Sequence, residues 1–270
     1  MSLLLLAAEK KPGFQEVHPI GPESFEFKSF TDFTLFGLHV AVTRMVTMAF
    51  FAAIVISLFF LIALRKPKMV PGRLQFSAEA IYGFVRDQVA KDVIGPEGIR
   101  FASYLTSLFV FILVLNLYEI LPLAQTPVTG RIAYPAVLAI ATWILFIAVG
   151  IKKQGFGAYF KGALLPPGVP KGLYVLLTPI EFVSTFIFRP FTLAVRLFAN
   201  MFAGHLLVLI FFSGALYMWS VGGLQIAFGT VAFLIGIVVT FFELLIISLQ
   251  AYIFVTLTAV YVAESLAEEH

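Results

Sequence analysis

The sequence predicts an all-α polytopic membrane protein with five membrane-spanning helices and one interfacial amphipathic helix, the last two spans forming a long, steeply tilted hairpin. Hydrophobic residues make up 60% of the chain and Asp, Glu, Lys and Arg only 12%. A soluble domain has about 45–50% apolar and about 25% charged residues. The mean hydropathy of +0.99 therefore excludes a soluble globular protein and a disordered one.

Several classes of chemistry are excluded by residues that the chain lacks. It has no cysteine, which removes disulfides, thiolate metal sites and thiol nucleophiles. Its four histidines show no metal-ligand spacing, and no glycine-rich phosphate loop occurs. The net charge of +3 is small and its cations lie in clusters beside the apolar segments. We expect no metal, no cofactor and no nucleic-acid partner.

The first three spans are predicted at residues 38–64, 101–121 and 134–151. Each is close to the ~20 residues that cross a ~30 Å hydrocarbon core. Residues 1–37 form an external N-terminal segment, and residues 38–270 form a single helical membrane domain. The chain starts without a basic segment ahead of its short apolar run, so a cleaved signal is not expected.

Residues 73–93 show helical periodicity, with one apolar and one charged face. This pattern indicates an interfacial helix lying on the membrane. A soluble cap helix fits the periodicity alone equally well.

The last two apolar stretches, residues 173–219 and 224–267, are too long for upright crossings. Each would measure roughly 67 Å as a helix, about twice the hydrocarbon core. Neither has a polar turn in its middle. We therefore expect two helices that meet near residues 220–223 and tilt beyond the usual range of 0–40°.

The distribution of Lys and Arg predicts the orientation. Eleven of them lie in the loops after the first and third spans, and four lie on the opposite side. The positive-inside rule places the eleven in the cytoplasm. With five crossings, the N-terminus is then external and the C-terminus cytoplasmic.

Arg196 is the most unusual residue, because apolar sequence surrounds it in FRPFTLAVRLFANMF. A charge at the bilayer centre costs about 2.5–3.5 kcal/mol on insertion scales, and an intramembrane charge is by default a functional candidate. The structural alternative is that the side chain extends to the membrane surface, or that it forms an ion pair with no functional role inside the bundle. Arg189, seven residues earlier, and Asn200, four residues later, share its helical stripe, whereas His205 faces elsewhere.

The final span carries a second group of polar residues. Glu243 and Gln250 are seven apart and share a face. Glu243 and His205 could each take and release protons near neutral pH. A static hydrogen bond between them that holds the hairpin is the alternative. Three further polar residues sit nearer the span ends: Asn116, Glu119 and Glu181.

Three segments together resemble subunit a of the F-type ATP synthases. They are RLFANMFAGH, FELLIISLQAYIFVTLTAVYVAE and NLYEILP. The resemblance extends from the first span onward and is strongest over the last hundred residues. It implies a proton-conducting stator beside a rotor ring of c subunits, with peripheral-stalk b subunits, the rest of the ATP synthase and the lipid bilayer as partners. It implies no catalytic site on this chain.

The resemblance also implies roles for individual residues. Arg196 matches the family's essential arginine, and Asn200 and Gln250 match positions close to it. His205 and Glu243 match an acid/histidine pair that some members carry in the opposite order. Two groups match the mouths of the half-channels: Asn116 and Glu119 on the external side, and Glu181 with Ser184 on the cytoplasmic side.

Other classes of membrane protein fit less well. A secondary transporter would show repeated halves with paired broken helices, and no such repeat is visible. A structural anchor leaves Arg196, His205 and Glu243 unexplained. A hydrolytic enzyme needs a nucleophile–base or metal constellation, which the sequence lacks. We expect a multi-pass protein of a bacterial plasma membrane.

Overall fold

The structure, a computed structural model, describes residues 31–35, 38–121, 128–165 and 170–267. It divides into two units, Met1–Arg44 and Met45–His270. The expected external segment therefore lies largely outside the described residues.

The described part of the first unit is a β-hairpin that the sequence analysis missed. Strand β1 (Thr31–Leu35) pairs antiparallel with β2 (Leu38–Val42). The first long helix therefore begins six residues after the expected start of the span at residue 38. Helix α2 (Arg44–Leu64) has 21 residues, or about 31 Å, which already suffices for the hydrocarbon core. Arg44 is the first residue of this helix and of the first candidate span.

Every regular element in the described part of the second unit is a helix. After α2, the elements up to the middle of the chain are α3 (Arg73–Val85), the π-helical η2 (Arg86–Ile94), the 3-10 helices η3 (Pro96–Phe101) and η4 (Val128–Gly130), and α4 (Ala102–Leu117). The remainder are α5 (Ala133–Gln154), α6 (Phe156–Leu164), η5 (Lys171–Leu173), α7 (Tyr174–Phe182), η6 (Val183–Phe188), α8 (Arg189–Val221) and α9 (Gln225–Leu266).

Five helices in the described ranges are long and apolar enough to cross a membrane. The predicted fold class is confirmed. The fourth is continuous from α7 through η6 into α8, 48 residues in all. Its π-helical segment η6 directly precedes Pro190, the second residue of α8. Because proline has no N–H to donate, the widened turn lets the helix continue past it.

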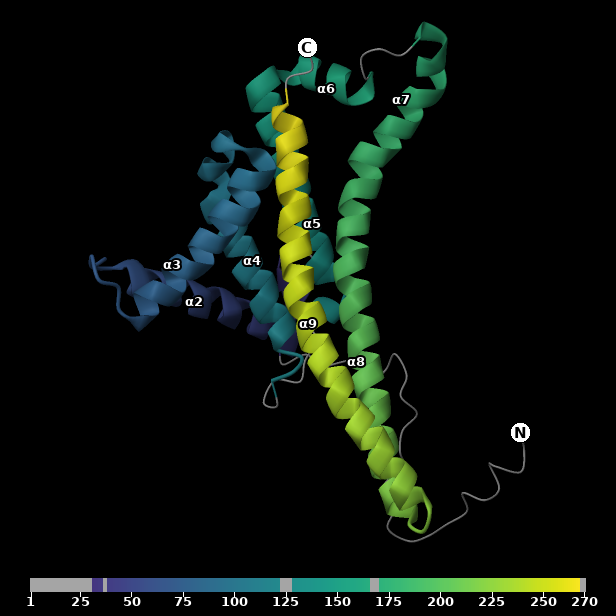
Figure 1. Cartoon of the computed structure of the whole chain (residues 1–270). Coiled ribbons are helices and arrows are strands. Elements are labelled where there is room, and N and C mark those ends of the chain that lie inside the picture. Colours follow the sequence, from purple (N-terminus) through teal and green to yellow (C-terminus); the bar gives the residue numbers. More distant parts are fainter. Residues whose placement is uncertain (1–30, 36–37, 122–127, 166–169, 268–270) are drawn as a thin grey trace. The chain divides into compact units, whose positions relative to one another are not determined.

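A tight turn joins α8 to α9. Gly222 and Gly223 both have positive φ angles, 83° and 65°, a conformation that glycine adopts without steric cost. The chain therefore reverses within three residues and α9 returns along α8 (Figure 1).

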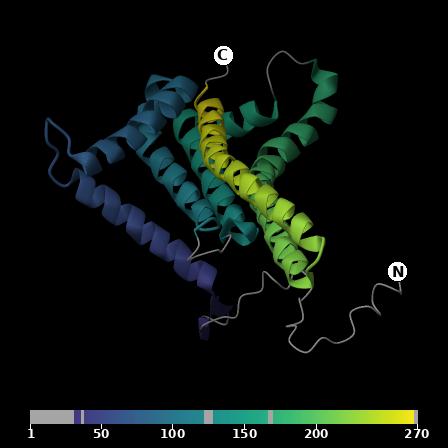
Figure 2. The ribbon, with the colours of Figure 1, turned by 60° about the horizontal axis from the view of Figure 1, so that its bottom comes forward.

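The buried core gathers around the second half of α9. Ala251, Phe254, Val255 and Ala259 are fully buried there against α4, α5 and α8. The first half of α9 contacts α8 but leaves many large apolar side chains exposed, including Phe228, Phe241 and Phe242. At the end where α9 finishes, α7 leans away from it, and α6 lies in between (Figures 1 and 2).

Candidate functional site

Arg196 lies on an exposed face of α8. The other side of the helix is buried through Leu193, Ala194 and Leu197. Across the part of the chain that the structure describes, its guanidinium makes no hydrogen bond or ion pair. A permanent cation therefore points outward from an apolar helix, which requires either water or a partner there.

One turn beyond Arg196, Asn200 links α8 to α9. Its Nδ2 donates a hydrogen bond to Oε1 of Gln250 over 2.8 Å. Gln250 is 2% exposed, and its own Nε2 has no partner among the described residues. The amide pair therefore fixes the two helices beside the arginine and leaves one donor unused.

The contact between α8 and α9 follows a regular seam. The buried residues of this hairpin seam recur on α9 every seven positions: Gly229, Gly236, Glu243 and Gln250. Gly236 approaches the side chains of Phe211 and Phe212, and a Cβ on Gly204 of α8 would collide with the carboxylate of Glu243. Glycine on one helix or the other thus makes room for a neighbouring group at the levels of Gly229, Gly236 and Glu243.

A cluster of three titratable groups lies at the middle of the seam. Nδ1 of His205 is 3.2 Å from Oε1 of Glu119, whose side chain is only 3% exposed. The carboxyl groups of Glu119 and Glu243 interact directly, and Glu243 also interacts electrostatically with His205. Glu243 is 4% exposed. The structure thus joins residues from α8, α9 and the turn after α4.

The geometry adds a third residue to the expected pair. The sequence analysis paired His205 with Glu243 and placed Glu119 at a span end. In the structure Nδ1 of His205 contacts Oε1 of Glu119, and Glu243 interacts with both residues. The sequence contains only a weak signal for the contact between His205 and Glu119, because this contact depends on how the turn after α4 packs against α8.

Asn116 lies three residues before Glu119 in the chain and is fully buried. Its Oδ1 accepts a hydrogen bond from Oγ1 of Thr129 over 2.7 Å, while its Nδ2 has no partner among the described residues. Thr129, in η4, is also fully buried. Sequence reasoning missed this threonine, because nothing in a short turn indicates which amide it meets.

A second polar region opens at the other end of α8. A cavity of about 320 Å³ is lined by residues of six elements and by the residue after α9: Gln154, Tyr159, Gly162, Ala163, Glu181, Thr185, Arg189, Glu264, Ser265 and Ala267. Arg189 forms an ion pair with Glu264 across it and lies over the ring of Tyr261. Burial raises the pKa of Tyr159, so its phenol stays neutral at the cavity wall.

Of the two residues expected here, Glu181 lines the cavity, whereas Ser184 is not among its lining residues. Thr185 and Glu264 line it and were missed. Thr185 lies in the π-helical segment η6, whose extra residue per turn rotates side chains away from the positions that α-helical spacing predicts.

Within the described ranges, no group of three His, Asp or Glu side chains is arranged to hold a metal ion. The site consists instead of an exposed arginine with one polar cluster on each side along α8. At 1.5 Å per residue, Arg196 lies about 13 Å from the level of His205 and about 22 Å from that of Glu181.

Comparison with known proteins identifies the family. The family described as ATP synthase A chain matches residues 45–263. A protein of Parafrankia sp. named ATP synthase subunit a is 45% identical over 265 residues, covering 98% of this chain and 88% of its own length. Proteins of the same name from Frankia alni and Rhodococcus erythropolis are 45% and 46% identical, covering 92% and 84% of this chain and 86% and 84% of their own lengths. The chain therefore belongs to the ATP synthase A chain family and is an integral, multi-pass membrane protein.

Proposed function

We propose that this chain is the stator that couples proton flow to rotation of a ring of c subunits in a bacterial ATP synthase. It provides two half-channels that do not meet. The external one contains Asn116, Glu119, His205 and Glu243. The cytoplasmic one is the cavity at Glu181, with Ser184 near its wall. Arg196, flanked by Asn200 and Gln250, faces the ring between them.

The observation that carries this proposal is the exposed guanidinium of Arg196, which has no hydrogen bond or ion pair to any described residue. An arginine inside a bundle would be expected to pair with a carboxylate of its own chain. Here Arg189 has such a partner in Glu264, whereas Arg196 has none among the described residues. Its partner is therefore best supplied by another subunit, as a carboxylate buried in the membrane.

The electrostatics of such a pair suit rotary transport. A protonated carboxylic acid can face lipid, whereas an ionised one cannot without a large desolvation cost. A proton from the external half-channel neutralises a ring carboxylate and rides with it almost a full turn. Near Glu181 it is released to the cytoplasm. Arg196 then favours the ionised carboxylate and repels protons that would pass directly between the half-channels.

The cluster of Glu119, His205 and Glu243 at the hairpin seam, here called the triad, supports proton uptake. Two neighbouring carboxyl groups cannot both be ionised at low cost, so a proton taken up here would be held between Glu119 and Glu243, which interact with each other. The imidazole of His205 lies beside them and faces partly outward, with 20% of its side chain exposed. Short steps between these groups would carry a proton between the buried acids and the surface of α8 at His205.

The tilt of the hairpin also belongs to the proposal. Two helices of 48 and 42 residues exceed the thickness of the bilayer. A steep tilt lets α8 and α9 follow the curved ring, and the exposed phenylalanines of α9 provide its apolar contact. The peripheral-stalk b subunits would contact the cytoplasmic side, which carries the C-terminus. Domain boundaries at residues 37 and 38 remain a prediction.

The decisive experiment replaces Arg196 by alanine in the assembled complex in membrane vesicles. ATP-driven proton pumping should be abolished, and passive proton conductance should change after the soluble sector is removed. Arg73→Ala is the matched control, because Arg73 is also exposed but lies at the start of α3. Normal pumping by the assembled Arg196→Ala complex would refute the stator role of this residue.

A further inference from the structure

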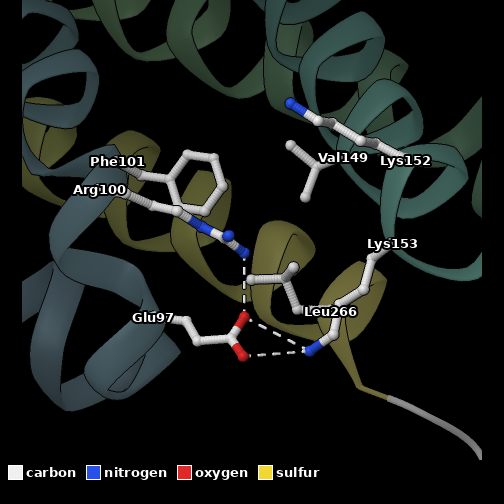
Figure 3. Close-up of a pocket in the computed structure, with 7 residues that line it drawn as sticks. All are labelled: Glu97, Arg100, Phe101, Val149, Lys152, Lys153 and Leu266. Carbon is white, nitrogen blue, oxygen red and sulfur yellow. Dashed lines mark hydrogen bonds and ion pairs between the residues drawn. The ribbon is translucent and has the colours of Figure 1, made fainter.

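A second cavity, of about 390 Å³, shares no lining residue with the cavity at Glu181. Its lining residues are Glu97, Arg100, Phe101, Val149, Lys152, Lys153 and Leu266. They come from η3, the end of α5 and the end of α9. Figure 3 shows Glu97 and Arg100 on one side and Val149, Lys152 and Lys153 on the other.

The charges in this basic pocket are unbalanced. Glu97 accepts from Arg100 over 2.9 Å and pairs with Lys153 over 3.4 Å. Lys152 has no hydrogen bond or ion pair within the described part of the chain. Among the described residues that line the cavity, three cations thus share a single carboxylate, which leaves an excess of two positive charges.

Two of the cations, Arg100 and Lys153, are held in place beside apolar side chains. The guanidinium of Arg100 lies 5.0 Å from the ring centroid of Phe101, which fixes its planar fork at the rim. The side chain of Lys153 is only 27% exposed. Leu266 and Val149 supply apolar wall beside these charges. Polar donors at the rim and apolar contacts beneath suit an amphipathic anion.

We propose that the basic pocket binds a phosphate group, either the headgroup of an anionic phospholipid or free phosphate. Arginine and lysine together bind phosphate oxygens through charge-assisted hydrogen bonds. Pockets of 300–1,000 Å³ accommodate small ligands. Basic pockets between helices on the positively charged side of a membrane protein favour anionic lipids. The cavity lies at the ends of α5 and α9, beside the loop residues whose positive charge predicts the cytoplasmic side.

The test uses the intact complex in phosphatidylcholine vesicles that contain a photoreactive phosphatidylglycerol, with photoreactive phosphatidylcholine as the neutral comparison. Phosphatidylglycerol should label the end of α5 more strongly. Lys152→Gln should lower that labelling about fivefold, and Lys152→Gln with Lys153→Gln should lower it further, since each surface cation contributes about 1 kcal/mol to binding anionic lipid. Lys152→Arg should retain it.

The matched control is Lys91→Gln, which removes an equal charge from η2, outside the pocket. The Lys152→Gln variant breaks no contact of Lys152 found in the described residues, so the complex should assemble. Labelling that is equal for the two lipids, or equally reduced by Lys91→Gln, together with no effect of inorganic phosphate, would overturn the proposal.

Inorganic phosphate distinguishes the two sources, with sodium chloride of equal ionic strength as the comparison. If phosphate leaves the phosphatidylglycerol label unchanged, the lipid headgroup is the occupant. If phosphate alone displaces the label, or protects Lys152 from amine acylation in pure phosphatidylcholine vesicles, the pocket takes the free ion. Either result supports a phosphate site.

Discussion

Gly204 determines whether the carboxylate of Glu243 can reach its place in the triad. A Cβ at position 204 would collide with Oε1 of Glu243. The far end of a flexible side chain can move, so Gly204→Ala should leave the complex assembled while displacing this carboxylate. We expect ATP-driven proton pumping to fall severalfold, measured by fluorescence quenching in vesicles.

The control for this prediction is Gly214→Ala on the same helix, because a Cβ there meets nothing within 4 Å. It should pump normally. If both variants pump alike, the position of the Glu243 carboxylate has no influence on the proton path.

Thr129 offers a second test at the scale of the residue. Thr129→Val removes the donor to the fully buried Oδ1 of Asn116 and should destabilise the subunit by about 1–3 kcal/mol. Thr258→Val is the control, because the hydroxyl of this equally buried threonine bonds only to Phe254 O of its own helix. Thermal unfolding of the purified complex should separate the two variants, and equal midpoints would contradict the prediction.

At the scale of the helices, the close approach of α8 and α9 along the hairpin seam depends on glycines, because every other residue is larger. A Cβ on Gly229 would lie 2.8 Å from Cδ1 of Trp219 and 3.0 Å from the carbonyl oxygen of Ala215. Since backbone cannot move aside as a side chain can, Gly229→Ala should push α8 and α9 apart, at a cost of about 1–3 kcal/mol.

The expected result is a lower thermal midpoint of the complex, with Gly214→Ala again unchanged. Cysteines introduced as a pair at Ala215 and Gly229 would be unsuitable for this test, because they alter the same contact. An unchanged midpoint for Gly229→Ala would mean that the turn at Gly222 and Gly223 alone sets the distance between the two helices.

The helices differ in how far the sequence predicts them. Length and hydropathy are local properties, so the long apolar stretches and the glycine turn were visible. The π-helical segment η6 was not visible in the sequence. It lets the helix continue past Pro190, which has no N–H to donate, and this depends on the three-dimensional course of the backbone. Helix α6 and the β1–β2 hairpin are short, nine and ten residues in helix or strand, and short elements carry little periodic signal.

The same limit applies to the candidate site. The sequence identified Arg196, His205, Glu243 and Gln250 because polar residues in apolar spans need a reason. The pairing of His205 with Glu119, and the cavity closed by Arg189 and Glu264, depend on contacts between helices distant in the chain. A single sequence carries no local pattern for such contacts.

For the whole molecule, the orientation can be tested because the chain has no native cysteine. In otherwise unchanged complexes, Ser77→Cys on α3 should react with a membrane-impermeant maleimide only from the cytoplasmic side. Ser220→Cys, at the exposed end of α8, should react only from the external side. These outcomes follow from the positive-inside rule and five crossings.

Inside-out and right-side-out vesicles supply the two sides, and the cysteine-free parent chain measures background labelling. Reaction of both cysteines from one side would require an even number of crossings between them. Reaction of each from the side opposite to the one expected would invert the topology and place the basic pocket on the external face.

The burial of the second half of α9 between α4, α5 and α8 has a consequence for biogenesis. This segment follows its neighbours in the chain, so the ribosome completes it after them. Until then Asn116, Glu119 and His205 enter the bilayer without the helix that later covers them. Membrane insertion of the earlier helices must therefore tolerate these polar groups for as long as synthesis lasts, and α9 closes the bundle only after it has left the translocation machinery.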